Sequence, residues 1–126
     1  MGGGSVMKLS IKSVRSLGGA KVINKAGEKL GKIEDFTIDL ATGRIAYAVL
    51  SFGGFIKGNK LFAIPINALK LDVDRGSFIL DVDKERLENA PGFDTSNWPD
   101  MADPEWGARV HSYYGVVPYT GNPFNL

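Results

Sequence analysis

The clearest pattern along the chain is a set of short runs in which apolar and polar residues alternate. Phe36, Ile38 and Leu40 alternate with polar residues, and this period of two predicts a β-strand. Ile33 is out of phase with them. A one-residue bulge at residues 34–35 would return Ile33 to the same face of the strand. We therefore expect one long strand with a bulge near its middle.

Two later runs, residues 44–52 and 60–66, are apolar on both faces. In the first run we expect one face to consist of Ile45, Tyr47 and Val49, and the other of Ala46, Ala48, Leu50 and Phe52. A strand of this kind is covered on both sides. The pattern therefore predicts a second layer that packs against the outside of these strands.

Turns that contain glycine separate the strands. Residues 25–28, 41–43 and 74–76 are such turns, and a last strand is expected near residues 77–82. Pro65 cannot donate a hydrogen bond to a neighbouring strand, so it belongs at an edge or a strand end. Five or six short strands without intervening helices predict a mainly β fold, a small antiparallel β-barrel.

After residue 82 the pattern becomes helical and then extended. Asp83 is expected to cap a short helix, and Asp103 a second helix near residues 104–114 with Pro104 at its first position. We expect residues 91–126 to form a C-terminal extension that packs on its own barrel or on a partner chain. Its candidate interface residues are Trp98, Trp106, Val110, Tyr113, Tyr114, Tyr119 and Phe124.

Composition places the chain among globular proteins. It has 126 residues, 44% hydrophobic and 23% charged, which suits one compact domain. The lack of cysteine excludes disulfides and thiolate chemistry. No apolar run approaches the ~20 residues that cross a bilayer, so we expect a cytoplasmic protein without a membrane segment. Residues 1–9 are expected to be a flexible N-terminus, in which Gly-Gly-Gly-Ser is typical of an added linker and Met7 would then be the natural start.

Charge is distributed unevenly, although the net charge is only +1. Residues 1–60 carry ten Lys or Arg and four Asp or Glu, whereas residues 61–126 carry five and ten. We favour the interpretation that turns and strand ends simply differ between the halves. The alternative is a basic face that meets an acidic partner or a second copy of the chain.

Residues with catalytic potential are few. Glu34, Asp35 and Asp39 are the one carboxylate cluster within a strand, but Asp35 is better explained as an acceptor for backbone N–H groups at the bulge. His111 is the single histidine and is expected to be exposed. With one histidine and no cysteine we expect no tetrahedral zinc site. Residues 53–60 resemble a phosphate loop only superficially, because a strand follows instead of a helix. We expect no catalytic residue, no metal and no cofactor.

Several motifs occur in order between residues 27 and 65: G-E-x-x-G-x-I, D-x-x-x-D, G-R-I-x-Y-x-V-L-S and G-G-F…G-x-K-x-F-A-I-P. Together they resemble the PRC-barrel family, and residues 10–90 are identified as its barrel. The residues that carry this resemblance are Gly27, Gly31, Asp35, Asp39, Gly43, Gly53, Gly54, Gly58 and Pro65. The late "LENAPGFD" and "YYG" are similar to stand-alone bacterial and archaeal members.

The resemblance implies a small β-barrel that serves in assembly. The family is known from the cytoplasmic part of the reaction-centre H subunit and from the second domain of a ribosome maturation factor, and neither is an enzyme. We therefore expect a non-enzymatic adaptor that binds an unidentified protein and pairs with itself, a homodimer being favoured. The alternative is an RNA- or ribosome-associated factor that uses Lys29, Lys32, Lys57 and Lys60. An enzyme is the least favoured reading.

Overall fold

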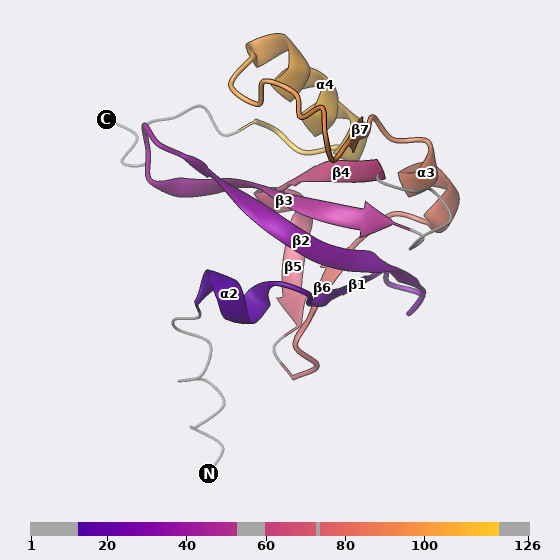
Figure 1. Ribbon diagram of the computed structural model, residues 1–126. Coiled ribbons are helices and arrows are strands. Elements are labelled where there is room, and N and C mark those ends of the chain that lie inside the picture. Colours follow the sequence, from indigo (N-terminus) through magenta and orange to yellow (C-terminus); the bar gives the residue numbers. More distant parts are fainter. Residues whose placement is uncertain (1–12, 53–59, 73, 119–126) are drawn as a thin grey trace.

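A single β-sheet organises the chain. The computed structural model describes residues 13–52, 60–72 and 74–118. Seven strands lie in the order β5-β6-β1-β2-β3-β4-β7 (Figure 1). In chain order the elements are α2 (Val14–Leu17), β1 (Lys21–Ile23), β2 (Lys29–Asp39), β3 (Arg44–Phe52), β4 (Lys60–Pro65), the 3-10 helix η2 (Ile66–Ala68), β5 (Leu69–Asp72), β6 (Ser77–Leu80), α3 (Lys84–Glu88), β7 (Phe93–Asp94) and α4 (Pro104–Tyr114).

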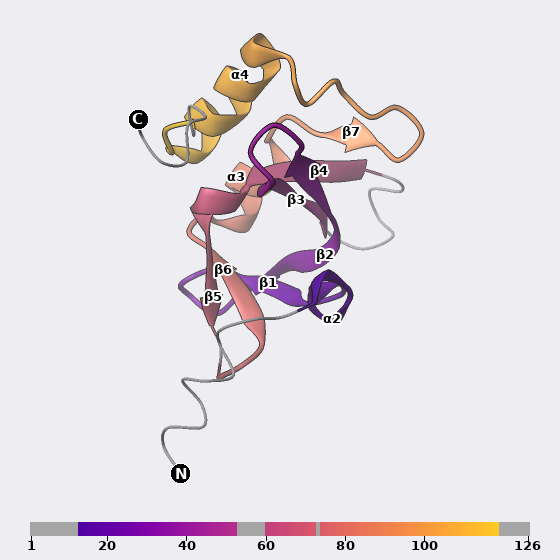
Figure 2. The same ribbon diagram turned by 90° about the vertical axis from the view of Figure 1, so that its left-hand side faces the viewer.

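The mainly β prediction is confirmed, but the details of the sheet differ from the expected antiparallel barrel. β1 pairs with β6 in parallel, while every other neighbouring pair is antiparallel. The seventh strand, β7, comes from the expected C-terminal extension and pairs with β4. The strands surround a common interior (Figure 2), yet the two edge strands, β5 and β7, are not hydrogen-bonded to each other within the described residues.

Two bulges in the β2–β3 pair decide which side chains face inward. The first shifts the register between Ile33 and Asp35, as predicted, and Asp35 Oδ1 accepts the Phe36 N–H at 2.8 Å. The second lies where Thr37 pairs with Tyr47 but Ile38 pairs with Ile45. Because one extra residue reverses the alternation, the predicted faces of two residues are wrong, as described next.

Residues 45 and 46 change sides at the second bulge. Ile45 packs against the interior core of the sheet, and Ala46 packs against the outer layer. Simple alternation had placed Ile45 with Tyr47 and Ala46 with Ala48. A bulge is set by pairing with the neighbouring strand, so the period-two pattern of residues 44–52 alone does not reveal it.

The interior core consists of apolar side chains from β1, β2, β3, β4, β6 and α3, and of Ala90 just after α3. The Phe52 and Phe62 rings meet edge to face at 6.1 Å between centroids. Leu87 of α3 is fully buried there. The buried members are Val22, Leu30, Ile33, Phe36, Ala48, Leu50, Phe52, Phe62, Ile64, Phe78, Leu80, Leu87 and Ala90.

A smaller core lies on the opposite face of β3 and β4, beneath α4. It is centred on Tyr47, Ala63 and Val110. Both faces of β3 are therefore covered, since Tyr47, Ala48, Val49 and Leu50 are all buried. The predicted second layer exists, and in the described chain it is α4 of the same molecule (Figure 1).

Side-chain caps begin both C-terminal helices where the sequence predicts them. Asp83 Oδ1 accepts the Arg86 N–H at 2.8 Å, and Asp103 Oδ1 accepts the Glu105 N–H at 3.0 Å. Pro104 occupies the first turn of α4, and Gly115, at φ 72°, ends that helix. None of the helices found among the described residues has the length and hydrophobicity required to cross a bilayer.

Gly31 is required because β2 and β3 approach closely beside it. A Cβ atom at this position would lie 2.0 Å from the Ser51 carbonyl oxygen and 3.2 Å from Leu50 Cδ1. The first contact is with backbone, which cannot rotate away as a side chain could. Any other residue at position 31 would have to push the two strands apart.

We predict that Gly31→Ala lowers the free energy of unfolding by at least ~2 kcal/mol, the scale of overpacking in a tight interior. Gly18→Ala is the matched control, because Gly18 has an extended backbone at φ −65° and its nearest atom lies 3.4 Å from the added Cβ. Urea unfolding followed by tryptophan fluorescence measures both. Equal stability of the two variants would contradict the close approach at Gly31.

Candidate functional site

An apolar groove of about 780 Å³ lies between the β2–β3 hairpin, η2 and the beginning of α4. These segments are distant in sequence and meet because α4 packs on the outer face of β3 and β4. Apolar residues from all three regions line it, among them Ile38, Leu40, Ile45, Ile66, Met101 and Pro104. The groove has the character of a binding site, which is typically concave and mostly apolar.

Tyr47 forms the aromatic floor of the groove. Its side chain is only 5% exposed and its ring meets Trp106 and His111 edge to face, with centroids 5.1 Å and 5.6 Å away. Gly107 allows α4 to approach, since a Cβ there would lie 3.3 Å from Tyr47 Oη. Burial raises the pKa of Tyr47. The floor is therefore neutral, with a hydroxyl as its polar group.

His111 is half-buried beside Tyr47, so the prediction that it is exposed is wrong. The covered face of α4 is broader than the Trp106–Tyr114 stripe and includes Gly107 and His111. His111 Nδ1 lies 2.8 Å from the Gly107 carbonyl oxygen. A carbonyl can only accept, so Nδ1 carries the proton and Nε2 is the acceptor of the neutral ring. His111 is also one of the residues that line the groove.

Other polar residues of the groove hold backbone groups in place. Asp39 Oδ1 accepts the Ala41 N–H at 2.9 Å, and Asp103 caps α4. Asn67 Nδ2 donates to the Val117 carbonyl at 3.1 Å, which fixes the chain after α4 against η2. These side chains stabilise the walls of the groove, and its chemistry is suited to binding apolar groups.

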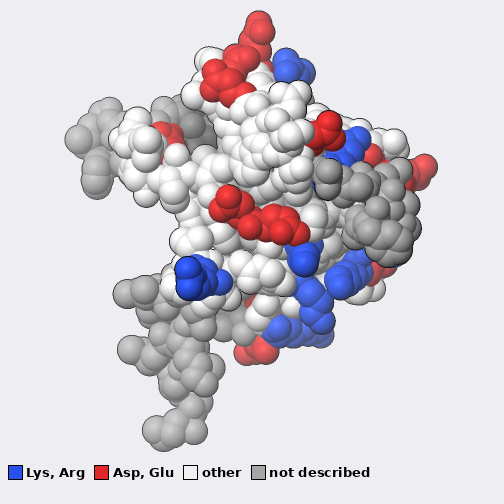
Figure 3. Space-filling model, viewed as in Figure 1, with Lys and Arg blue, Asp and Glu red and all other residues white. Residues whose placement is uncertain are grey.

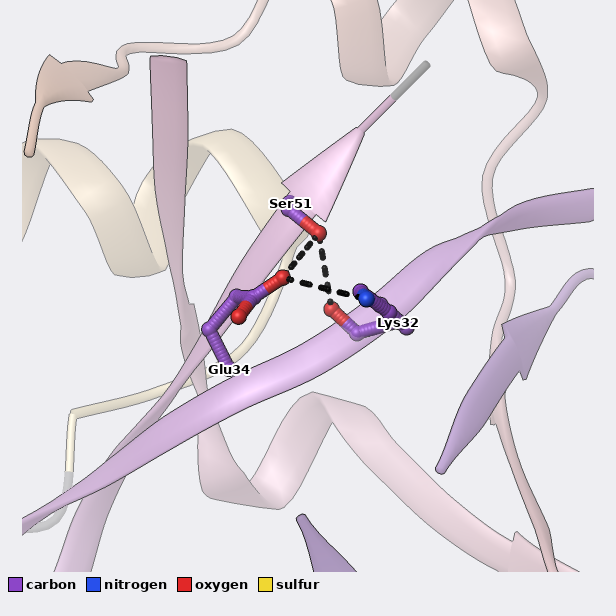
Figure 4. A network of polar contacts seen from close by, with 3 residues as sticks. All are labelled: Lys32, Glu34 and Ser51. Atoms are coloured by element: carbon purple, nitrogen blue, oxygen red, sulfur yellow. Dashed lines mark hydrogen bonds and ion pairs between the residues drawn. The ribbon is translucent and has the colours of Figure 1, made fainter. Parts of the chain in front are cut away.

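The predicted carboxylate cluster is not assembled into a site. Asp39 lines the groove, whereas Glu34 and Asp35 do not. Glu34 Oε2 instead accepts from Ser51 Oγ at 2.7 Å and lies 4.0 Å from Lys32 Nζ, on the exposed face of the sheet (Figure 4). Within the described residues no group of three or more His, Cys, Asp or Glu is placed to hold a metal ion.

The candidate interface residues are found in different surroundings. Val110 is buried in the outer core, and Trp106 packs on Tyr47. Trp98 remains 42% exposed, with its ring 5.1 Å from that of Phe93 and its Nε1 donating to the Thr95 carbonyl at 2.9 Å. Tyr119 and Phe124 lie outside the described residues. Of the residues placed, Trp98 offers the most exposed surface to a partner.

Tyr113 and Tyr114 are adjacent but differ in their hydrogen bonding. Tyr113 Oη donates to the Arg86 carbonyl, and the Arg86 guanidinium lies 4.4 Å from the centre of the Tyr113 ring. Tyr114 packs against both cores, and its buried Oη has no hydrogen-bond partner among the described residues. Burial, with a smaller contribution from Tyr113, raises the pKa of Tyr114. Tyr114 therefore joins the two cores.

The residues of the family motif have mainly structural roles. Gly27 and Gly43 adopt positive φ, 87° and 74°, in the turns before β2 and β3. Pro65 ends β4, as predicted. Gly53, Gly54 and Gly58, together with Lys57, lie outside the described residues. These residues therefore form turns and close approaches, and of those that the structure describes only Asp39 lines the groove.

The sequence pattern did not single out the exposed apolar tip of the β2–β3 hairpin. Leu40 is 91% exposed and Ile38 is 47% exposed, and both line the groove. Alternation predicts that both face the same side of the strand as Phe36. The second bulge separates them from Phe36, however, and the hairpin projects beyond the other strands (Figure 1). The position of Leu40 directly before the turn at residues 41–43 was the available signal.

A lysine-rich surface lies on the outside of β1 and β2. Lys21 is paired directly with Lys32 across the two strands, and Lys29 is paired with Ile23. Figure 3 shows the corresponding gathering of blue side chains, bordered by red ones. Lys32 has the ion pair to Glu34, while the Lys21 and Lys29 side chains have no ion pair within the described part of the chain. This surface does not adjoin the groove, whose lining contains no lysine.

Comparison with known proteins identifies the domain. A PRC-barrel domain family model matches residues 11–87. Among solved structures, a protein described as the 16S ribosomal RNA processing protein RimM of Pseudomonas aeruginosa is similar, with 20% identity and a TM-score of 0.43 over 63% of this chain. The similarity spans about half of that protein, 48% of its chain. No curated protein matches.

We predict opposite effects of removing the two neighbouring hydroxyls. Tyr114→Phe should raise the free energy of unfolding by about 1 kcal/mol, because it removes a buried polar atom without a partner. Tyr113→Phe should lower it by a similar ~1 kcal/mol, because it removes a hydrogen bond. Urea unfolding at neutral pH measures both changes.

The Tyr114→Phe variant also tests the raised pKa of Tyr114. Above pH ~10 the unfolded chain ionises this tyrosine, while the folded chain keeps it neutral. The wild-type chain therefore loses stability as the pH rises, and the advantage of Tyr114→Phe should grow between pH 7 and about pH 11. A destabilised Tyr114→Phe would show that the hydroxyl has a partner in solution.

Proposed function

Because the chain belongs to the PRC-barrel domain family, we propose that it is a non-enzymatic protein-binding module that supports assembly. The observation that carries this proposal is the apolar groove beside α4, with Tyr47 as its floor. Its described carboxylates, Asp39 and Asp103, hold a turn and a helix cap. Such a surface favours burial of a partner's apolar side chains over proton transfer.

The geometry of the groove also indicates the form of the ligand. Apolar walls of three separate segments supply burial, worth about 1.5–3 kcal/mol for each large aliphatic or aromatic side chain. Tyr47 Oη and His111 Nε2 can orient a backbone group next to such side chains. We therefore expect a short protein segment with two or three apolar side chains, held in the groove by burial and positioned by few hydrogen bonds.

A peptide selection tests this function. Peptides selected on the wild-type chain from a random library should be rich in Leu, Ile and Phe. Ala108→Arg should weaken their binding at least tenfold, because Ala108 is an exposed helical residue that lines the groove. Ser112→Arg is the matched control, one turn further along α4 and outside the groove lining. Peptides that bind both variants equally would place the binding site elsewhere.

RNA association is the second candidate function, and the lysine-rich surface favours it. Like charges paired directly across strands are destabilising, and a phosphate group near Lys21, Lys29 and Lys32 would relieve that repulsion. The net charge of the chain is only +1, so the rest of the molecule adds no general attraction for RNA. Binding would therefore depend on this one surface and would be sensitive to salt. Of the other lysines named from the sequence, Lys60 lies over the Phe62 ring at 5.5 Å.

We predict that the triple variant Lys21→Gln, Lys29→Gln and Lys32→Gln reduces RNA affinity and lowers the salt slope by roughly 0.7 for each lost phosphate contact. Fluorescence anisotropy with a labelled single-stranded RNA at several salt concentrations measures this. The control replaces exposed Lys70, Lys84 and Arg109 with Gln, which changes the net charge equally. Failure of the wild-type chain to bind RNA at low salt would eliminate this second function.

A further inference from the structure

The tip of the β2–β3 hairpin combines exposed apolar side chains with turn N–H groups that are already hydrogen-bonded. Leu40 has the largest exposed fraction of the large hydrophobic residues in the described chain. The N–H groups of the turn are satisfied internally: Ala41 by Asp39 Oδ1, Thr42 and Gly43 by the Asp39 carbonyl, and Arg44 by Thr42 Oγ1. Burial of this tip would therefore leave none of these donors without a partner.

The tip and the groove lie side by side on one surface. Ile38 and Leu40 project from the hairpin and also form one wall of the groove. Two copies of such a surface can pair about a two-fold axis, with the protruding element of each copy in the groove of the other. The symmetry then makes each contact twice. This self-complementarity singles out one kind of occupant from all apolar protein segments.

We propose that a second copy of the chain fills the groove, with Leu40 of each molecule inserted into the groove of the other. This pairing rests on the proposed function and names its partner. Each molecule supplies a residue that completes the site of the other. The Tyr47 and His111 floor then contacts the inserted hairpin tip.

Sedimentation equilibrium of the full chain over a dilution series tests the pairing. The wild-type chain should show a concentration-dependent equilibrium between monomer and dimer. Leu40→Ser and Ala108→Arg should each raise the dissociation constant at least tenfold, the first by removing the inserted side chain and the second by obstructing the groove. Val117→Ser is the control, since Val117 is 77% exposed but does not line the groove. Leu40 and Ala108 are exposed, so neither change should disturb the fold, and circular dichroism checks this.

Mixing the two weakened variants distinguishes this arrangement from any other interface. Leu40→Ser retains an open groove and Ala108→Arg retains Leu40, so their heterodimer keeps one of the two contacts. The mixture should therefore associate more tightly than either variant alone. Association that is insensitive to both changes, or that is not restored by mixing, would overturn the proposal.

The remaining outcomes separate the pairing from the broader function. A wild-type chain that is monomeric at every concentration overturns the pairing. If selected peptides still bind in the groove of that monomer, the protein-binding function stands and the occupant is another protein. If the chain becomes dimeric only after residues 119–126 are removed, its own C-terminal residues compete for the groove and the pairing of the full chain is refuted.

Discussion

The packing of α4 on the outer face of β3 and β4 is the contact on which the rest of the structure depends. The two central strands are apolar on both sides, and the interior core can cover only one of them. Tyr47, Ala63 and Val110 close the other side, and Tyr114 reaches from α4 into both cores. The groove is a consequence of this arrangement, because α4 rests on the strands but the hairpin extends past the helix. A site of this kind exists only when both layers are in place.

Small residues and bulges then determine the dimensions of that arrangement. Gly31 brings β2 and β3 together, and Gly107 lets α4 approach the Tyr47 hydroxyl. The second bulge turns Ile45 inward and leaves Ala46 under the helix layer. Beyond that bulge the hairpin no longer contributes to the interior core in the way its alternation suggests. This explains why Leu40 is exposed although its position in the alternation predicts a core residue.

Local features were predictable from the sequence because they depend on local chemistry. The first bulge, the helix caps at Asp83 and Asp103, the turn glycines and the two-sided coverage of β3 all follow from nearby residues. The parallel pairing of β1 with β6 and the two-residue strand β7 depend on contacts between distant segments. The half-buried His111 and the groove itself depend on how far α4 stands from the hairpin. The sequence periodicity of α4 or of β2 gives no information about the distance between these two elements.

Three polar residues around the groove support the proposed role in recognition. Asp39 holds the hairpin turn, Asp103 holds the first turn of α4 and Asn67 holds the chain that leaves α4. Each of these contacts fixes one wall before any partner arrives, and a preformed surface loses less conformational entropy on binding. Asp39, Asp103 and Asn67 are thus engaged with the backbone of the protein itself. The rigidity of the walls and the neutrality of the Tyr47 floor both favour burial of an apolar side chain.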